Sequence, residues 1–274
     1  MANNRSPLVW LGSKYRYVQD DQPLGRLFRS WNHSGLTFYE PFCGAAHATL
    51  CVTERNQKVF LNDDNWGVAC FWTSVIRWPC ALQNAFWSLR PSEDLFLKLR
   101  YLPHVPSDSS REEVIRCAAN FLALNRWSVN GIGRVWLNRN SGKGANAISQ
   151  IDWCHWRMSF LRIIDDRCHS LDWRQAVSDS RECLHFVDPP YILNGRDRYS
   201  CCFSVAQHIA LRDWLMESSF CSWILTYGDV DEVRNLYHLD SEDLFSQTFD
   251  NVGRGCRNLG HQDGQLLVAK RPVP

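Results

Sequence analysis

The side chains best suited to chemistry form a tetrad that directly follows the apolar residues 184–187: Asp188, Pro189, Pro190 and Tyr191. The apolar run predicts a buried strand, and open α/β sheets bind their ligands at the carboxyl ends of the strands. The prolines fix the backbone so that nearby carbonyl groups face outward as acceptors, and the Asp188 carboxylate is a second acceptor. The Tyr191 ring offers a flat face on which a planar base could stack.

These groups suit the methylation of an exocyclic amine on a heterocyclic base. The lone pair of such an amine is delocalised into the ring, and acceptors that bind the amine hydrogens favour the form that attacks a methyl donor. A structural interpretation stands beside this one, because an Asp-Pro-Pro sequence after a strand often forms only a stiff turn.

Three further segments contain residue types suited to binding a nucleotide-like ligand. Near the amino terminus, beside Trp10, Gly12 would allow a ligand to approach the backbone and Lys14 could pair with a carboxylate. The segment around Gly44 predicts a strand, a glycine turn and a helix, which form the first half of a doubly wound nucleotide-binding fold. The next predicted strand is followed by Asp63, at the place where such folds accept the ribose hydroxyls of a nucleoside.

The distribution of charge points to a polyanion, although the net charge is only +1. No Asp or Glu occurs from residue 114 to residue 151, whereas this segment contains five basic residues: Arg116, Arg126, Arg134, Arg139 and Lys143. Such a block predicts contacts to nucleic-acid phosphates, and the alternative is a solvated basic face. Within it, Arg134 follows an Asn-Gly pair in a loop suited to base edges, whereas Arg126 lies at the end of an apolar helix and is expected to be structural.

The elements that must position these residues alternate between strands and helices. A capping box formed by Ser110 and Glu113 marks one helix start. Strands are expected at residues 36–40, 58–61, 184–187, 222–226 and 264–269. Helices are expected at residues 45–52, 110–127, 152–171 and 204–218, with a helical stretch interrupted by prolines at 66–102.

Composition limits the class of protein. The chain has 274 residues, of which 45% are hydrophobic, and can form one large domain or a domain with an insertion. No apolar run reaches the roughly 20 residues of a membrane span and no signal peptide is visible, so the protein is expected in the cytoplasm. The twelve cysteines form no Cys-x-x-Cys pattern, which predicts reduced thiols and no structural zinc.

In their order along the chain, these motifs resemble those of the D12 class, or Dam-like, DNA adenine-N6 methyltransferases. Residues 10–14 (Trp-Leu-Gly-Ser-Lys) resemble the amino-terminal Trp-x-Gly-Gly-Lys element of that family, and residues 40–44 (Glu-Pro-Phe-Cys-Gly) resemble its methyl-donor turn. Residues 63–65 resemble its Asp-x-Asn ribose element, and the Asp188 tetrad resembles its catalytic tetrad. The chain departs from the family pattern in four places, because glycines are replaced by Ser13 and Ala46, an aromatic residue by Val129 and a polar residue by Trp136.

The resemblance implies an α/β fold with a Rossmann-like S-adenosylmethionine-dependent methyltransferase sheet, helices on both of its faces and an inserted, mainly helical DNA-recognition region. It implies a discontinuous catalytic domain at residues 1–78 and 172–274 and target recognition by residues 79–171. The implied activity is site-specific methyl transfer from S-adenosylmethionine to N6 of an adenine flipped out of double-stranded DNA, without a metal. The implied setting is a bacterial cytoplasm or a phage-infected cell, with a possible cognate restriction endonuclease.

The resemblance also assigns roles to individual residues. The implied catalytic residues are Asp188, Pro189, Pro190 and Tyr191. The implied cofactor contacts are Trp10, Gly12, Lys14, Glu40, Pro41, Phe42, Gly44, Asp63 and Asp188. The implied DNA contacts are Arg126, Asn130, Gly131, Arg134, Arg139 and Lys143. Two other classes remain open: an N4-cytosine methyltransferase, which uses a similar tetrad, and a DNA-binding relative that has lost turnover.

Overall fold

The computed structural model describes residues 5–10, 12–19, 21–31, 35–101, 109–137, 143–191, 203–218, 221–237, 245–249 and 265–270. Within them the chain forms a seven-stranded sheet with the strand order β3-β2-β1-β4-β5-β7-β6. The strands are β1 (Thr37–Glu40), β2 (Lys58–Asn62), β3 (Arg162–His169), β4 (Cys183–Val187), β5 (Ser222–Gly228), β6 (Phe245–Phe249) and β7 (Gln265–Lys270). β1 to β5 pair in parallel with one another, and β7 runs antiparallel between β5 and β6.

Strand β4 lies at the centre of this sheet. All five of its residues are buried, as the apolar sequence predicts, because β4 pairs with β1 on one side and β5 on the other. The strand order reverses between β1 and β4, since the chain passes from β1 outward to β2 and β3 before it returns to β4. Ligands of open α/β sheets bind at such a switch point, beside the carboxyl ends of the strands.

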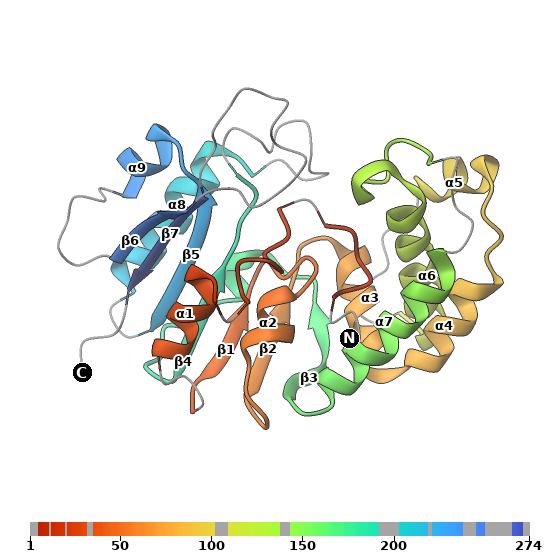
Figure 1. Ribbon diagram of the computed structural model, residues 1–274, viewed down its shortest axis with the longest axis horizontal. Coiled ribbons are helices and arrows are strands. Elements are labelled where there is room, and N and C mark those ends of the chain that lie inside the picture. Colours follow the sequence, from red (N-terminus) through yellow and green to blue (C-terminus); the bar gives the residue numbers. More distant parts are fainter. Residues whose placement is uncertain are drawn as a thin grey trace.

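Helices cover both faces of the sheet (Figure 1). The helices are α1 (Pro23–Ser30), α2 (His47–Val52), α3 (Trp66–Arg77), α4 (Pro79–Ser88), α5 (Glu93–Leu99), α6 (Arg111–Trp127), α7 (Lys143–Met158), α8 (Val205–Glu217) and α9 (Asp231–Tyr237). Side chains of β5 alternate between the two cores, because Ile224 packs in the core shared with α1 and α2 whereas Trp223 and Leu225 pack with α8. The arrangement confirms the expected Rossmann-like fold.

Helices α3 to α7 gather beside the β3 end of the sheet (Figure 1). The expected capping box is present at the start of α6, where the Ser110 hydroxyl accepts from Glu113 N and the Glu113 carboxylate accepts from Ser110 N. This helical cluster contains much of the segment expected to recognise DNA. The division into catalytic and recognition regions stays a prediction.

One expected helix is wrong over its second half. Residues 152–171 were expected to be helical throughout, but α7 begins earlier, at Lys143, and ends at Met158, and residues 162–169 form β3. The β-branched Ile163 pairs with Val59 of β2, and this pairing outweighs the helical spacing of the apolar residues. After this pair the register between β2 and β3 shifts. The shift is caused by a bulge in β3, in which Asp165 and Asp166 have positive φ angles of 57° and 50°.

No helix within the described residues is long and apolar enough to cross a membrane.

Candidate active site

A cleft lies at the carboxyl ends of the parallel strands, at the switch point. Glu40 ends β1, Asp63 follows β2 and Asp188 follows β4, so three carboxyl groups reach the same edge of the sheet. The cleft is partly open to solvent. Trp10 and Lys14 line it from the amino-terminal segment. The structure therefore brings together residues that the sequence analysis selected from four separate segments.

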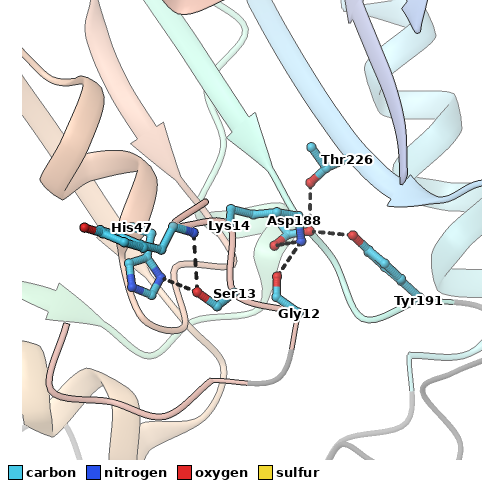
Figure 2. Close-up of polar contacts among 8 residues, drawn as sticks. Gly12, Ser13, Lys14, His47, Asp188, Tyr191 and Thr226 are labelled. Carbon is cyan, nitrogen blue, oxygen red and sulfur yellow. Dashed lines mark hydrogen bonds and ion pairs between the residues drawn. The ribbon is translucent and has the colours of Figure 1, made fainter. Parts of the chain in front are cut away.

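Asp188 forms a largely buried ion pair with Lys14 (Figure 2). The Lys14 ammonium lies 2.7 Å from Asp188 Oδ2, and it also donates to the carbonyl oxygen of Gly12 at 2.7 Å. The Lys14 side chain is 3% exposed and the Asp188 side chain 20%. Gly12 has a φ of 76°, a conformation that favours glycine, and this turn directs its carbonyl at the ammonium. The sequence analysis placed both residues in the site, and the structure joins them directly.

The second oxygen of the Asp188 carboxylate is held by two hydroxyl groups. Thr226 Oγ1 of β5 donates to Asp188 Oδ1 at 2.7 Å, and the Tyr191 hydroxyl donates to the same oxygen at 3.4 Å (Figure 2). Thr226 is fully buried and was not among the expected site residues. Thr226 could have been identified from the sequence only if the strand order were known, because its hydroxyl lies near the carboxyl end of β5, the strand next to β4.

The Tyr191 ring packs against the end of β5. A Cβ atom added to Gly228 would lie 3.4 Å from Tyr191 Cδ2, and the Tyr227 ring centroid is 5.7 Å from that of Tyr191. The Lys14 ammonium lies 5.1 Å from the centroid of the Tyr191 ring, within the distance of a cation–π contact. Tyr191 is thus oriented by three neighbours before any base arrives.

We expect Thr226→Val to slow methyl transfer while the fold is retained. Valine has a similar shape but no hydroxyl, so Asp188 Oδ1 loses its shorter hydrogen bond. A hydrogen bond to a charged group contributes about 1.5–3 kcal/mol, which corresponds to a loss of about 10- to 150-fold in the single-turnover rate. Thr226→Ser keeps the hydroxyl and should remain close to wild type. Equal rates for the valine and serine variants would show that this hydrogen bond does not position Asp188 for the reaction.

The Gly44 turn forms the floor of the cleft and has no room for a side chain. Gly44 has a φ of +46°, and a Cβ atom there would lie 2.4 Å from Trp10 Nε1. The Gly44 N–H donates to Asp63 Oδ2 at 2.8 Å, and the Gly44 carbonyl accepts from Trp72 Nε1 at 2.8 Å. Asp63 Oδ1 also accepts from Asn65 N at 3.1 Å. The Asp63 carboxylate therefore holds the Gly44 turn at the end of β2 by a hydrogen bond, a role that the sequence analysis did not predict.

Two other carboxyl groups of the cleft, those of Glu40 and Asp63, have raised pKa values. Burial, partly opposed by hydrogen bonds from Thr49, raises the pKa of Glu40 to about 8. Burial and the negative charge of Asp64 raise the pKa of Asp63 to about 7. A positively charged ligand in the cleft would favour the ionised forms of both groups.

The raised pKa of Glu40 makes stability fall as pH rises. The folded pKa of about 8 exceeds the ordinary 4.5, so between these values the folded state binds a proton that the unfolded state has released. Buried His47, His185 and His208, whose pKa values are lowered mainly by burial, oppose this trend only below about pH 6.5.

From pH 6.5 to 8 we therefore expect the free energy of unfolding to decrease, with Glu40 contributing about 1–2 kcal/mol at about 1.4 kcal/mol per pH unit. Urea unfolding at both pH values measures the decrease. Glu40→Gln cannot ionise and should show a smaller decrease than wild type. An unchanged decrease in that variant would mean that other groups carry the pH dependence.

The structure places Arg134 on an exposed turn after α6. Ser128 and Trp136 form an antiparallel bridge, and between them Gly133 N donates to Ser128 Oγ at 2.9 Å. Asn130 has a positive φ of 57° in this turn. Arg139 lies outside the described residues, and the described part of Lys143 is its backbone, at the start of α7.

Asn125, which the sequence analysis missed, joins this turn to the amino-terminal segment. Its amide group accepts from Val9 N at 2.8 Å and donates to the carbonyl oxygens of Val9 at 2.8 Å and Gly131 at 2.9 Å. A Cβ atom at Gly131 would lie 2.0 Å from Val9 O, so only glycine fits this close contact. The Arg134 turn is therefore fixed against the residue that precedes Trp10 of the cleft.

Arg126 also anchors the amino-terminal segment. Its guanidinium donates to Pro7 O at 3.2 Å, and burial lowers its pKa. This position agrees with the structural role expected from its place at the end of a helix and does not favour a contact with DNA phosphates.

The described residues contain no group of three or more His, Cys, Asp or Glu side chains that could hold a metal ion. A comparison with curated protein sequences found no match. The family profile of the D12 class N6 adenine-specific DNA methyltransferases matches residues 10–247, which include the Lys14 segment, the Gly44 turn and the Asp188 tetrad. Because this match covers most of the chain, the protein belongs to the D12 class N6 adenine-specific DNA methyltransferase family.

Proposed function

We propose that this protein transfers a methyl group from S-adenosylmethionine to N6 of an adenine flipped out of double-stranded DNA, at specific sites. The observation that carries the proposal is the Asp188 carboxylate, which is fixed at the switch point by Lys14, Thr226 and Tyr191. A preorganised acceptor at this place suits an amine that gains positive charge as it attacks a methyl group.

The cleft fits the methyl donor on two grounds. The Gly44 turn leaves a cradle that a Cβ atom would fill, and the carboxyl groups of Glu40 and Asp63 suit a cation. The proposed cofactor contacts are Trp10, Gly12, Lys14, Glu40, Pro41, Phe42, Gly44, Asp63 and Asp188. Each Asp63 oxygen accepts one backbone N–H and retains a second lone pair, which is compatible with a ribose hydroxyl. When bound, S-adenosylmethionine supplies the activated methyl group.

The residues of the chain then act on the adenine. Asp188 and the carbonyl groups around Pro189 and Pro190 accept from the N6 amine, and Tyr191 stacks on the base. Extraction of the base from the duplex costs roughly a few kcal/mol, which the stacking and the hydrogen bonds offset. Asn130, Gly131, Arg134, Arg139 and Lys143 are the proposed DNA contacts. A cytoplasmic location and a cognate restriction endonuclease stay predictions of the resemblance.

The experiment that tests this function is methyl transfer from radiolabelled S-adenosylmethionine to duplex DNA, followed by nucleoside analysis. We expect N6-methyladenine. If the product is N4-methylcytosine instead, the target base is cytosine and not adenine. No transfer to any DNA by a folded protein that binds DNA would favour a relative without turnover.

Arg134 is the proposed reader of sequence. A bidentate contact from an arginine to guanine contributes about 1–3 kcal/mol of discrimination, so Arg134→Ala should reduce the preference for the cognate site about 5- to 150-fold. Methylation-aware sequencing of treated genomic DNA measures this preference. Arg134→Lys keeps the positive charge but loses the planar guanidinium group that forms two parallel hydrogen bonds. This variant should therefore lose more of its preference for the cognate site than of its overall affinity for DNA. If Arg134→Ala methylates the same sites with the same relative preference, Arg134 contacts phosphates or packs within the protein.

A further inference from the structure

A serine–histidine pair lies in the cleft at two positions to which the family resemblance assigns no role. Ser13 and His47 both line the cleft, and Ser13 Oγ lies 3.2 Å from His47 Nδ1 beside Lys14 (Figure 2). Ser13 replaces a glycine of the resembled family, and His47 follows Ala46, which replaces another. Ala46 has a φ of 50°, so this chain adopts at Ala46 the left-handed conformation that a glycine would favour.

The hydrogen bonds of Ser13 allow its hydroxyl group to donate to His47. Tyr15 N donates to Ser13 Oγ at 3.3 Å, so the serine oxygen already accepts one hydrogen bond and its own hydrogen is available for His47. When the Ser13 hydroxyl donates to His47 Nδ1, the neutral ring carries its hydrogen on Nε2, and this tautomer is part of the proposal. Burial first, and then the positive charges of Lys14 and Arg5, lower the pKa of His47 to about 3, so the ring is neutral at physiological pH.

The Nε2–H group of His47 has no partner within the described residues. The side chain is only 7% exposed, but Nε2 itself keeps some contact with solvent. The side chain lines the cleft. The Tyr15 ring packs on the imidazole with centroids 5.5 Å apart and holds it in this orientation.

Lys14 offers a second free donor at the same end of the cleft. Its ammonium has three N–H groups, of which Gly12 O and Asp188 Oδ2 accept two. The third has no hydrogen-bond acceptor within the described part of the chain, although the ammonium also lies 5.1 Å from the centroid of the Tyr191 ring. Two unused donors, one of them charged, match an anionic acceptor. The carboxylate of the amino-acid part is the anionic group of S-adenosylmethionine.

We propose that His47, oriented by Ser13, donates a hydrogen bond from Nε2 to the carboxylate of the methyl donor, together with the third N–H of Lys14. This proposal rests on the proposed function, because it assumes that the cleft binds S-adenosylmethionine. It makes the replacement of a glycine by Ser13 a gain for donor binding, since a glycine could not orient the imidazole.

The test uses isothermal titration of the full-length protein with two ligands, S-adenosylhomocysteine and its decarboxylated analogue, which lacks only the carboxylate. His47→Ala should weaken S-adenosylhomocysteine by about 10- to 100-fold, as expected for a hydrogen bond to a charged group, and should leave the affinity for the analogue nearly unchanged. His47→Gln retains an N–H donor on its side chain and should recover part of the loss. Ser13→Ala should show a smaller loss that is again confined to the ligand with a carboxylate.

The controls separate this inference from the proposed function. Equal weakening of both ligands by His47→Ala would show that His47 only shapes the cleft, and no weakening would exclude a contact; either result overturns the inference alone. A wild-type protein that binds neither ligand overturns both proposals.

A second measurement does not depend on the stability of the His47 variants. Nitrogen-15 NMR of the ligand-free wild type should show His47 protonated at Nε2 and unprotonated at Nδ1. The opposite tautomer, or a charged ring at pH 7, would contradict the proposed arrangement.

Discussion

Replacing Asp188 with alanine is expected to lower the single-turnover rate of methyl transfer by about 10²–10³, because loss of one preorganised group that stabilises developing charge has an effect of this size. The Asp188 carboxylate accepts hydrogen bonds from Lys14 and Thr226, and no other residue of the tetrad has a carboxylate that could substitute for it. The rate is measured by rapid quench with enzyme in excess over labelled DNA. Circular dichroism and thermal unfolding establish that the variant is folded.

Variants of Tyr191 provide the comparison for this experiment. Its hydroxyl donates to Asp188 Oδ1 only at 3.4 Å, so Tyr191→Phe should react at nearly the wild-type rate. Tyr191→Ala loses base stacking worth roughly 1–3 kcal/mol and should fall between Tyr191→Phe and Asp188→Ala. A folded Asp188→Ala protein with near-normal methyl transfer would overturn the mechanism.

The second large effect is expected from Lys14→Met, which removes the ammonium but keeps an apolar stem of similar length. Loss of one partner from a buried ion pair destabilises a protein by about 3–5 kcal/mol. We expect the lower end of this range, because Asp188 is 20% exposed and keeps Thr226 and Tyr191 as donors. For a chain of this size, such a loss lowers Tm by about 5–10 °C.

Differential scanning calorimetry measures this change, with Lys98→Met as the control because Lys98 is an exposed lysine of α5. The double variant Lys14→Met/Asp188→Asn has no unpaired charge and should recover part of the lost stability. If Lys14→Met and Lys98→Met unfold at the same temperature, the ion pair does not stabilise the fold. The affinity for S-adenosylmethionine should also fall in Lys14→Met, by about 1–3 kcal/mol of binding free energy.

The site residues that could be predicted from the sequence are those whose positions depend on the neighbouring residues in the chain. Asp188 and Asp63 could be placed because each follows an apolar run that forms a strand, and strand ends of a parallel sheet share one edge. Gly44 could be placed because a turn between a strand and a helix favours a residue that adopts positive φ.

Other residues depend on contacts that no local pattern encodes. Thr226 meets Asp188 only because β5 pairs with β4, and Asn125 meets Val9 only because α6 packs beside the amino-terminal segment. Asp63 was expected to face a ligand, and its contact with Gly44 N depends on how β2 aligns with β1. The register of a sheet and the packing of helices determine such contacts, and neither follows from the spacing of apolar residues alone.

Residues 162–169 illustrate the limit for secondary structure. Their apolar side chains continue a helical spacing from α7, but the chain turns after Met158 and Ile163 pairs with β2 instead. In β3 the Ile163 side chain packs in the hydrophobic core beside Val59 of β2. Tertiary pairing therefore decides the structure of this segment.

The bulge in β3 has a consequence for aggregation. Within the described residues, β3 lies at one edge of the sheet, where a regular strand would present unpaired N–H and C=O groups to another chain. Asp165 and Asp166 break this row of groups with their left-handed backbone, and together with Arg167 they place charges there. A second chain could not add a continuous strand along this edge without removing the bulge and desolvating those charges. We therefore expect the bulge to oppose edge-to-edge association of this sheet with the sheet of a second molecule.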